Sequence, residues 1–222
     1  MHQLDSSASP YAEALVAALK QAGSLTQPLV EAAFRSVPRH AFLDHFFRRE
    51  IRAGKVQIQE VCPASYASLD GWLQAIYTNQ ALTISYSPEQ VAISSSSSPD
   101  AMASMLEALD LTRGLRVLAI GTGTGYNAAL LAFIVGEQGH IWTIEVDATL
   151  AQAAARRLAQ VAGSNVSVQK GNGLEGYEPG APYDRIVVTG STSTVPLPWL
   201  KQVRAGGIIL MNLIGEMGHV LS

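Results

Sequence analysis

Three groups of residues in this 222-residue chain have types and spacing that could bind and process a ligand. The first is a glycine-rich turn, Gly121-Thr122-Gly123-Thr124-Gly125-Tyr126, which follows the apolar run Val117 to Ile120. The second is an acid, Glu145, which lies beyond that turn. The third is a run of serines, Ser94 to Ser98, which is followed by Pro99.

The glycine-rich turn predicts a cofactor site. Glycines allow a sharp turn after a strand and bring bare backbone close to a ligand, and the next helix begins with free N–H groups. We predict cofactor contacts from Gly121, Thr122, Gly123, Gly125 and Tyr126, with a purely structural turn as the alternative. The dinucleotide pattern G-x-G-x-x-G does not fit, because Tyr126 takes the place of a glycine. The spacing favours a methyltransferase turn over a nicotinamide-binding one.

Glu145 ends an apolar run that begins at Ile141, about as far beyond the turn as a ribose-binding acid lies in nucleotide-binding folds. A carboxylate can accept hydrogen bonds from both ribose hydroxyls. Alternatively, Glu145 or Asp147 caps the following helix, where acids favour the helix dipole. We predict that Asp147 is the cap and that Glu145 binds ribose.

The serine run has two interpretations, a flexible linker or the start of a helix. Pro99 suits a first helical position, Asp100 suits the first turn, and apolar residues follow at helical spacing. We therefore predict a helix from about Pro99 to Leu109 with Ser98 as its N-cap. Hydroxyls and free N–H groups there could hold a carboxylate without a full positive charge.

The elements that position these groups alternate after about residue 100. Continuous apolar runs predict strands at Arg116–Ile120, Ile141–Glu145, Val166–Gln169, Arg185–Thr189 and Ile208–Leu213. Helical spacing predicts intervening helices at Tyr126–Val135, Ala148–Ala162 and near Trp199–Val203. This pattern is typical of an α/β fold with helices on both faces of a parallel sheet, whose ligands bind at the carboxyl ends of the strands.

The region before this alternation differs in character. Apolar spacing predicts helices at Tyr11–Ala22 and Leu29–Ser36, but the pattern from Gln57 to Ile93 is weak and predicts irregular structure with short strands such as Leu82–Ile84. We divide the chain into residues 1–98, an N-terminal helical and irregular substrate-facing region, and residues 99–222, a cofactor-binding core.

Composition excludes several classes of function. A net charge of −3 with 15% charged residues leaves no basic stripe, so no nucleic-acid partner is expected. The longest apolar run, Ala128 to Val135, is far short of the roughly 20 residues that cross a bilayer. Scattered histidines predict no metal site, and the lone Cys62 is expected to be a small buried or half-buried thiol rather than a nucleophile. The polar segment Met1 to Pro10 shows no secretory signal, which predicts a cytoplasmic protein.

A family resemblance follows from the motifs. The segment Leu115 to Ala132, LRVLAIGTGTGYNAALLA, resembles the first cofactor motif of protein-L-isoaspartate O-methyltransferases, which belong to the S-adenosylmethionine-dependent class I methyltransferases. Other segments resemble the family in the same order: Val37–Phe42, Tyr77–Ile84, Ala181–Thr189, Val195–Pro196 and Gly206–Gly207. The similarity spans most of the chain, from about Leu29 to Leu213.

The resemblance implies a Rossmann-like methyltransferase core that binds S-adenosylmethionine. It implies methyl transfer to the α-carboxylate of an L-isoaspartyl residue in a peptide or damaged protein, after which the ester closes to a succinimide. It places Ser97 on the family's active-site serine, with Ser96 and Ser98 beside it at the substrate, and adds Asn172, Gly173 and Thr189 to the cofactor contacts. No general base is required, because the carboxylate is already a nucleophile.

Three departures leave other functions open. Ala119 and Asn172 stand where the family usually has acids that bind the cofactor, and the stretch from Leu82 to Ser97 is longer than its family counterpart. One alternative is a methyltransferase dedicated to an aspartyl carboxylate of one precursor peptide. Another is a non-catalytic module that binds S-adenosylmethionine. The sequence does not predict an oligomeric state.

The predicted sheet also lacks its last strands. A methyltransferase sheet of this class continues with two strands after Ile208–Leu213, and Gly218 to Leu221 would begin the next one. We therefore expect either a truncated chain or a partner that covers the exposed edge, because open strand edges invite pairing.

Overall fold

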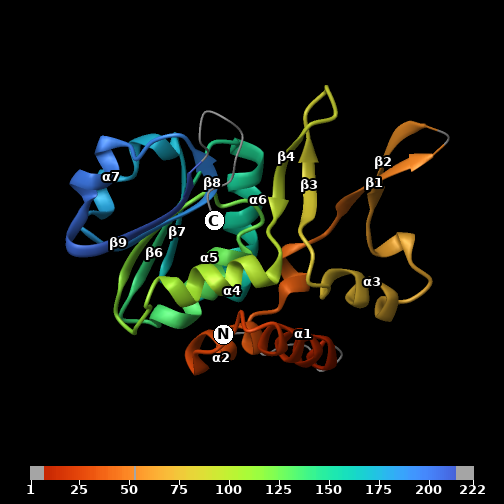
Figure 1. The fold of residues 1–222 in the computed structure, drawn as a ribbon, viewed down its shortest axis with the longest axis horizontal. Helices are drawn as coiled ribbons and strands as arrows, with labels where there is room; N and C mark the ends of the chain where they lie inside the picture. The colour runs from red at the N-terminus through yellow and green to blue at the C-terminus, as the bar shows by residue number, and fades with distance from the viewer. Residues whose placement is uncertain (1–7, 53, 214–222) are drawn as a thin grey trace.

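The computed structural model describes residues 8–52 and 54–213, which form two sheets and their flanking helices (Figure 1). The larger sheet is parallel, with strand order β7-β6-β5-β8-β9. Its strands are β5 (Arg116–Ile120), β6 (His140–Glu145), β7 (Val166–Lys170), β8 (Tyr183–Thr192) and β9 (Val203–Leu213). The associated helices are α4 (Pro99–Ala108), α5 (Tyr126–Val135), α6 (Ala148–Val161) and α7 (Leu197–Gln202).

Strand β5 lies in the middle of the sheet, with β6 and β7 on one side of it and β8 and β9 on the other. The strand order therefore reverses beside β5. Side chains alternate between the two faces of the sheet. Val117 and Ala119 of β5 contact the core beneath α4, α5 and α6, whereas Leu118 and Ile120 contact the core that includes Trp199 of α7. Helices therefore cover both faces, which confirms the predicted Rossmann-like α/β fold.

The parallel half matches the predicted elements closely. Strand β5 and helix α5 begin and end at the predicted residues, and α4 begins at Pro99 as expected. Strands β8 and β9 are longer than their apolar runs, because pairing between neighbours extends them into polar residues. Strand β8 adds residues at the carboxyl edge where the glycine-rich turn lies, whereas β9 is extended at its amino end.

The N-terminal region contains more regular structure than its sequence pattern predicts. Helices α1 (Ser9–Gln21) and α2 (Pro28–Ser36) were expected. An antiparallel sheet of order β2-β1-β3-β4 replaces the predicted irregular stretch, and α3 (Leu69–Ile76) lies between its hairpins. Its strands are β1 (Phe46–Arg52), β2 (Lys55–Val61), β3 (Leu82–Tyr86) and β4 (Ala92–Ser96). In Figure 1 both hairpins project from the helical base, and β3–β4 lies nearer the parallel sheet.

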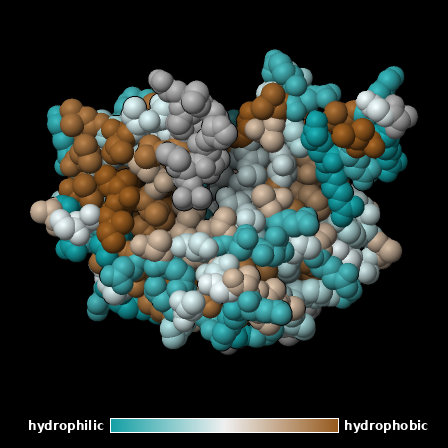
Figure 2. Space-filling model, viewed as in Figure 1, coloured by the Kyte–Doolittle hydropathy of each residue, from teal (hydrophilic) through white to brown (hydrophobic). Residues whose placement is uncertain are grey.

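Strand β9 lies at the end of the parallel sheet and is half-exposed along much of its length. Figure 2 shows apolar side chains gathered over α7 and β9. Leu197 and Leu200 of α7 are among the exposed apolar residues. The expected further strand at Gly218 to Leu221 lies outside the described residues. In the described part of the chain, no helix combines the length and apolar character needed to cross a membrane.

Candidate active site

The glycine-rich turn joins β5 to α5, and the backbone conformation at each of its three glycines favours glycine. Gly121, Gly123 and Gly125 have φ values of +91°, +53° and +93°, a region that other residues rarely adopt. A Cβ on Gly121 would also lie 2.5 Å from Oγ1 of Thr189. That hydroxyl donates to the carbonyls of Ile120 and Gly121 at 3.1 and 2.9 Å, which ties the turn to β8.

Glu145 is 8% exposed and lies at the carboxyl end of β6. Its Oε2 accepts from the N–H of Gly123 at 2.9 Å, and its Oε1 accepts from the N–H of Asp147 at 3.2 Å. Each oxygen keeps capacity for a further hydrogen bond, which suits a ribose diol. The Oδ1 of Asp147 accepts from the N–H groups of Thr149 and Leu150, so the predicted helix cap is confirmed.

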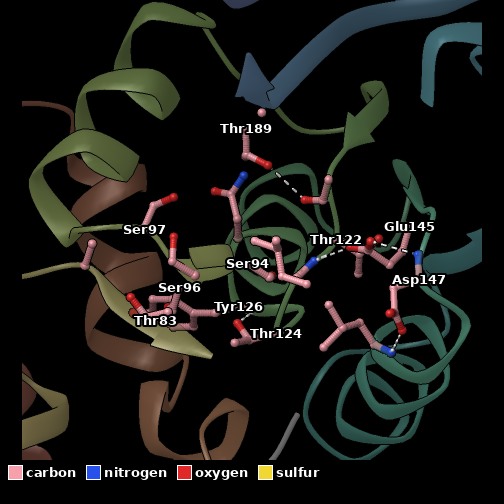
Figure 3. Close-up of a pocket in the computed structure, with 18 of the residues that line it drawn as sticks. Thr83, Ser94, Ser96, Ser97, Thr122, Thr124, Tyr126, Glu145, Asp147 and Thr189 are labelled. Atoms are coloured by element: carbon pink, nitrogen blue, oxygen red, sulfur yellow. Dashed lines mark hydrogen bonds between the residues drawn. The ribbon is translucent and has the colours of Figure 1, made fainter. Parts of the chain in front are cut away.

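A cavity of about 750 Å³ joins the turn to the serine run. Figure 3 shows Glu145 and Asp147 at one end of this cavity and Ser96, Ser97 and Thr83 at the other. The glycine-rich turn lies between the two ends. The cavity therefore connects a site suited to a nucleoside with a wall of hydroxyl groups.

Most of the predicted site residues line this cavity. They are Gly121, Thr122, Gly123, Tyr126, Glu145, Thr189, Ser96 and Ser97. Their roles as ligand contacts remain predictions. The cavity brings together two segments, the serine run and the turn, that are far apart in sequence.

Four predicted residues do not line the cavity. Gly125 lies behind the turn, where a Cβ would be 3.3 Å from Leu158. Asn172 begins a short 3-10 helix, η3 (Gly173–Glu175), and its Oδ1 accepts from the N–H of Leu174 at 3.1 Å. The carbonyl of Gly173 accepts a hydrogen bond from the indole N–H of Trp199 at 2.8 Å. These contacts give Gly125, Asn172 and Gly173 structural roles, and their roles as cofactor contacts stay predictions.

The fourth of these residues, Ser98, occupies the N-cap position of α4, but its side chain makes no capping hydrogen bond. The prediction of the position was correct, whereas the predicted capping interaction is absent. The N–H of Asp100 instead donates a hydrogen bond to a distant side chain, Oδ1 of Asn79, at 3.0 Å. A contact between residues so far apart leaves no signal in the local sequence pattern.

The sequence analysis missed several residues that line the cavity, including Thr83, Ala92, Ile93, Met102 and Asn127. Asn127 could have been found, because it directly follows Tyr126 at the start of α5. The other residues lie at the cavity because β3 pairs with β4 and because α4 packs beside it. Those contacts are long-range and have no local signature.

Three residues that line the cavity carry a buried polar atom without a partner among the described residues: Ser96 Oγ, Tyr126 Oη and Asn127 Oδ1. Buried polar groups almost always have hydrogen-bond partners. Together with the free capacity of Glu145, these atoms fit a ligand that carries hydroxyl and other polar groups at both ends. The residues present are thus compatible with a nucleoside cofactor beside a polar substrate.

The family model "Protein-L-isoaspartate(D-aspartate) O-methyltransferase (PCMT)" matches residues 57–219. A protein-L-isoaspartate O-methyltransferase of Ignicoccus hospitalis is 46% identical over 55% of this chain. One of Dictyoglomus turgidum is 34% identical over 92% of this chain and 77% of its own length. In four relatives, the Ignicoccus protein included, the match spans only 47% to 58% of the relative's length.

A solved structure titled as a protein-L-isoaspartate O-methyltransferase superposes with a TM-score of 0.71 at 29% identity. The superposition covers 91% of this chain and 55% of the other. It includes the N-terminal region as well as the parallel sheet, so the similarity is not restricted to the glycine-rich turn.

Proposed function

Because this chain belongs to the protein-L-isoaspartate(D-aspartate) O-methyltransferase family, we propose that it methylates the α-carboxylate of L-isoaspartyl residues in peptides or proteins. The cofactor is S-adenosylmethionine. One observation carries the proposal: a single cavity has Glu145 at one end and buried serine and tyrosine hydroxyls at the other. That arrangement can hold a nucleoside and a carboxylate together.

The chain's own residues bind and orient rather than transfer protons. Glu145 would accept hydrogen bonds from the ribose diol, and the backbone of Gly121 and Gly123 would allow close approach of the cofactor. The bound cofactor supplies a methyl group on a positively charged sulfur. A carboxylate is already nucleophilic at neutral pH, so the protein contributes alignment and exclusion of water.

A second candidate function is methylation of an aspartyl carboxylate in one dedicated precursor peptide. The hairpin formed by β3 and β4 favours it, because this hairpin projects beside the parallel sheet and its residues Ala92 and Ile93 line the cavity (Figure 1). An extended wall at the substrate end suits a peptide longer than one damaged residue. The cytoplasmic location and the lack of a nucleic-acid partner remain predictions from the sequence.

The test is transfer of labelled methyl from S-adenosylmethionine to matched peptides that contain isoaspartate or aspartate. We expect label on the isoaspartyl peptide alone. Label on the aspartyl peptide alone would favour the dedicated function. Binding of the cofactor product, S-adenosylhomocysteine, should be measured in parallel by calorimetry. Binding without transfer to either peptide would contradict the repair-type proposal.

A further inference from the structure

Two residues at the serine end of the cavity carry buried hydroxyls. Ser96 is 4% exposed and Tyr126 is 1% exposed, and both line the cavity. Neither Ser96 Oγ nor Tyr126 Oη has a partner among the described residues. A buried hydroxyl that is left unsatisfied destabilises the folded chain. Such a cost is expected where a ligand supplies the missing bonds.

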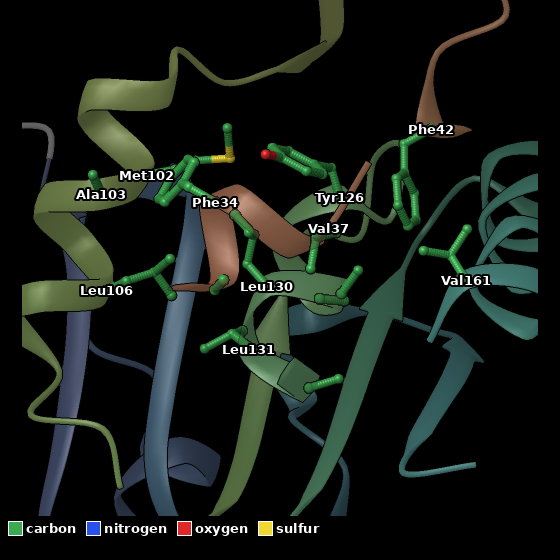
Figure 4. Close-up of a cluster of buried hydrophobic side chains, with 14 of the residues drawn as sticks. Phe34, Val37, Phe42, Met102, Ala103, Leu106, Tyr126, Leu130, Leu131 and Val161 are labelled. Atoms are coloured by element: carbon green, nitrogen blue, oxygen red, sulfur yellow. The ribbon is translucent and has the colours of Figure 1, made fainter. Parts of the chain in front are cut away.

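The surroundings of Tyr126 leave its hydroxyl few protein partners. Figure 4 shows the ring among apolar side chains, with its hydroxyl directed toward Met102. Phe34 and Phe42 contact the ring at centroid distances of 6.4 and 5.7 Å. Burial raises the pKa of Tyr126, so the phenol is a neutral hydrogen-bond donor.

A buried cation lies behind this ring. Arg39 is 0% exposed, and its guanidinium carbon lies 5.9 Å from the centroid of the Tyr126 ring. Its NH1 and NH2 groups donate to the carbonyls of Thr78 and Gln80. In the described part of the chain no acid pairs with Arg39, and its Nε has no partner. Burial lowers the pKa of Arg39, but a guanidinium stays charged in proteins.

We propose that Ser96 Oγ and Tyr126 Oη form a subsite for the substrate carboxylate, with Arg39 supplying a compensating positive charge from behind the tyrosine ring. The proposal rests on the proposed function and deepens it. The positive charge favours an anion in the cavity, and both hydroxyls can donate to a carboxylate oxygen. Because Arg39 does not line the cavity, it attracts the anion without bonding the nucleophilic oxygen.

This subsite lies at the correct end of the cavity for a methyl acceptor. Ser96 lies with Ser97 opposite Glu145 in Figure 3. Ser97, which the family resemblance assigns to the substrate, is only half-buried, whereas Ser96 is buried. The two serines would thus bind the acceptor from adjacent positions, with Ser96 as the donor farther from solvent.

The test uses Ser96→Ala and Tyr126→Phe in the full chain, saturated with S-adenosylhomocysteine. The probe is an isoaspartyl peptide, compared with the same peptide whose α-carboxylate is a carboxamide. Calorimetry measures peptide binding without requiring turnover. Ser85→Ala and Tyr86→Phe on β3 are matched controls, because neither residue lines the cavity. Thermal unfolding of each protein without peptide is the second measurement.

We expect each cavity variant to weaken binding of the carboxylate peptide about tenfold or more, as for loss of a hydrogen bond to a charged group. Binding of the carboxamide peptide should change little. The melting temperature should stay the same or rise, because a buried unsatisfied hydroxyl has been removed. A purely structural hydroxyl would instead lower the melting temperature and leave peptide binding unchanged.

The outcomes separate this proposal from the proposed function. If the wild type methylates the isoaspartyl peptide but both variants bind it normally, the subsite is wrong and the function stands. If the wild type binds the carboxylate peptide through these hydroxyls but transfers no methyl, the subsite stands and the function is wrong. Failure of the wild type to distinguish carboxylate from carboxamide overturns the subsite.

Discussion

The two ends of the cavity are built by different means. At the Glu145 end, backbone N–H groups and one carboxylate satisfy each other, and the helix cap at Asp147 is complete. At the serine end, the side-chain hydroxyls of Ser96 and Tyr126 are buried without partners within residues 8–52 and 54–213. The polar groups of the first end thus bond to one another, whereas those of the second end have bonding capacity to spare. The difference suggests that cofactor geometry is fixed by the backbone and substrate choice by side chains.

The largest effect that would sharpen this contrast is expected from Gly121→Ala. The substitution forces a Cβ toward Thr189 and strains a positive φ, which costs about 1–3 kcal/mol and displaces the turn. We expect affinity for S-adenosylhomocysteine to fall about 100-fold, which is about 2.7 kcal/mol. Calorimetry and thermal unfolding measure the two effects. Gly163→Ala, at an ordinary φ, is the control. An unaltered affinity would show that the turn is not rigidly organised.

Glu145→Gln should have the next largest effect. An amide has one acceptor oxygen where the carboxylate has two, so either Gly123 or Asp147 loses its partner and the ribose loses a strong acceptor. We expect cofactor affinity to fall about tenfold and stability to fall by about 1–3 kcal/mol. Urea unfolding and calorimetry report these values. Equal affinity in the variant would remove Glu145 from the cofactor site.

A matched pair of N-caps compares the two ends directly. Asp147→Ala removes a side chain that accepts from two backbone N–H groups, and we expect a loss of about 1 kcal/mol. Ser98→Ala removes a side chain without a capping bond, so a change within about 0.5 kcal/mol is expected. Urea unfolding measures both free energies. Equal losses would mean that the caps do not differ as described.

The smallest effect is expected from Ile93→Ser on β4. Ile93 is 60% exposed and lines the cavity, so stability should change by less than about 0.5 kcal/mol. We expect the KM for an isoaspartyl peptide to rise a few-fold, because an apolar contact near the substrate is lost. Cofactor affinity should not change. Steady-state kinetics at saturating cofactor provides the measurement. A change in cofactor affinity instead would place Ile93 at the other end.

The parallel half could be predicted because its signals are local. Strand β5, the glycine-rich turn and α5 follow each other directly in the chain. The apolar residues of β5 are buried on both faces of the sheet, which gives a continuous apolar run in the sequence. Asp147 could be predicted as a cap because it accepts from Thr149 and Leu150 within its own segment. Glu145 could be predicted from its position at the end of the next apolar run, although its bond to Gly123 joins two segments. The local sequence was therefore sufficient to predict most of the Glu145 end of the cavity.

The antiparallel sheet could not be predicted in the same way. Strands β1 and β2 expose most of their side chains, so no alternating apolar pattern marks them. Their stability comes from pairing, such as Phe46 with Val61, and Phe47 with Thr83 across a long separation. The role of Asn172 as a cofactor contact stays a prediction; in the structure its Oδ1 accepts from the N–H of Leu174. The substrate wall depends on contacts that only the folded chain contains.

The aromatic cluster around Tyr126 has a consequence for folding cooperativity. Phe34 comes from α2 and Phe42 from η1 (Arg39–Phe42), yet both contact Tyr126 at the first position of α5 (Figure 4). Residues of the N-terminal region and of the parallel half belong to one continuous core. Local opening of the first region would thus disturb the turn. We expect amides of α2 to become more protected from hydrogen exchange when cofactor binds.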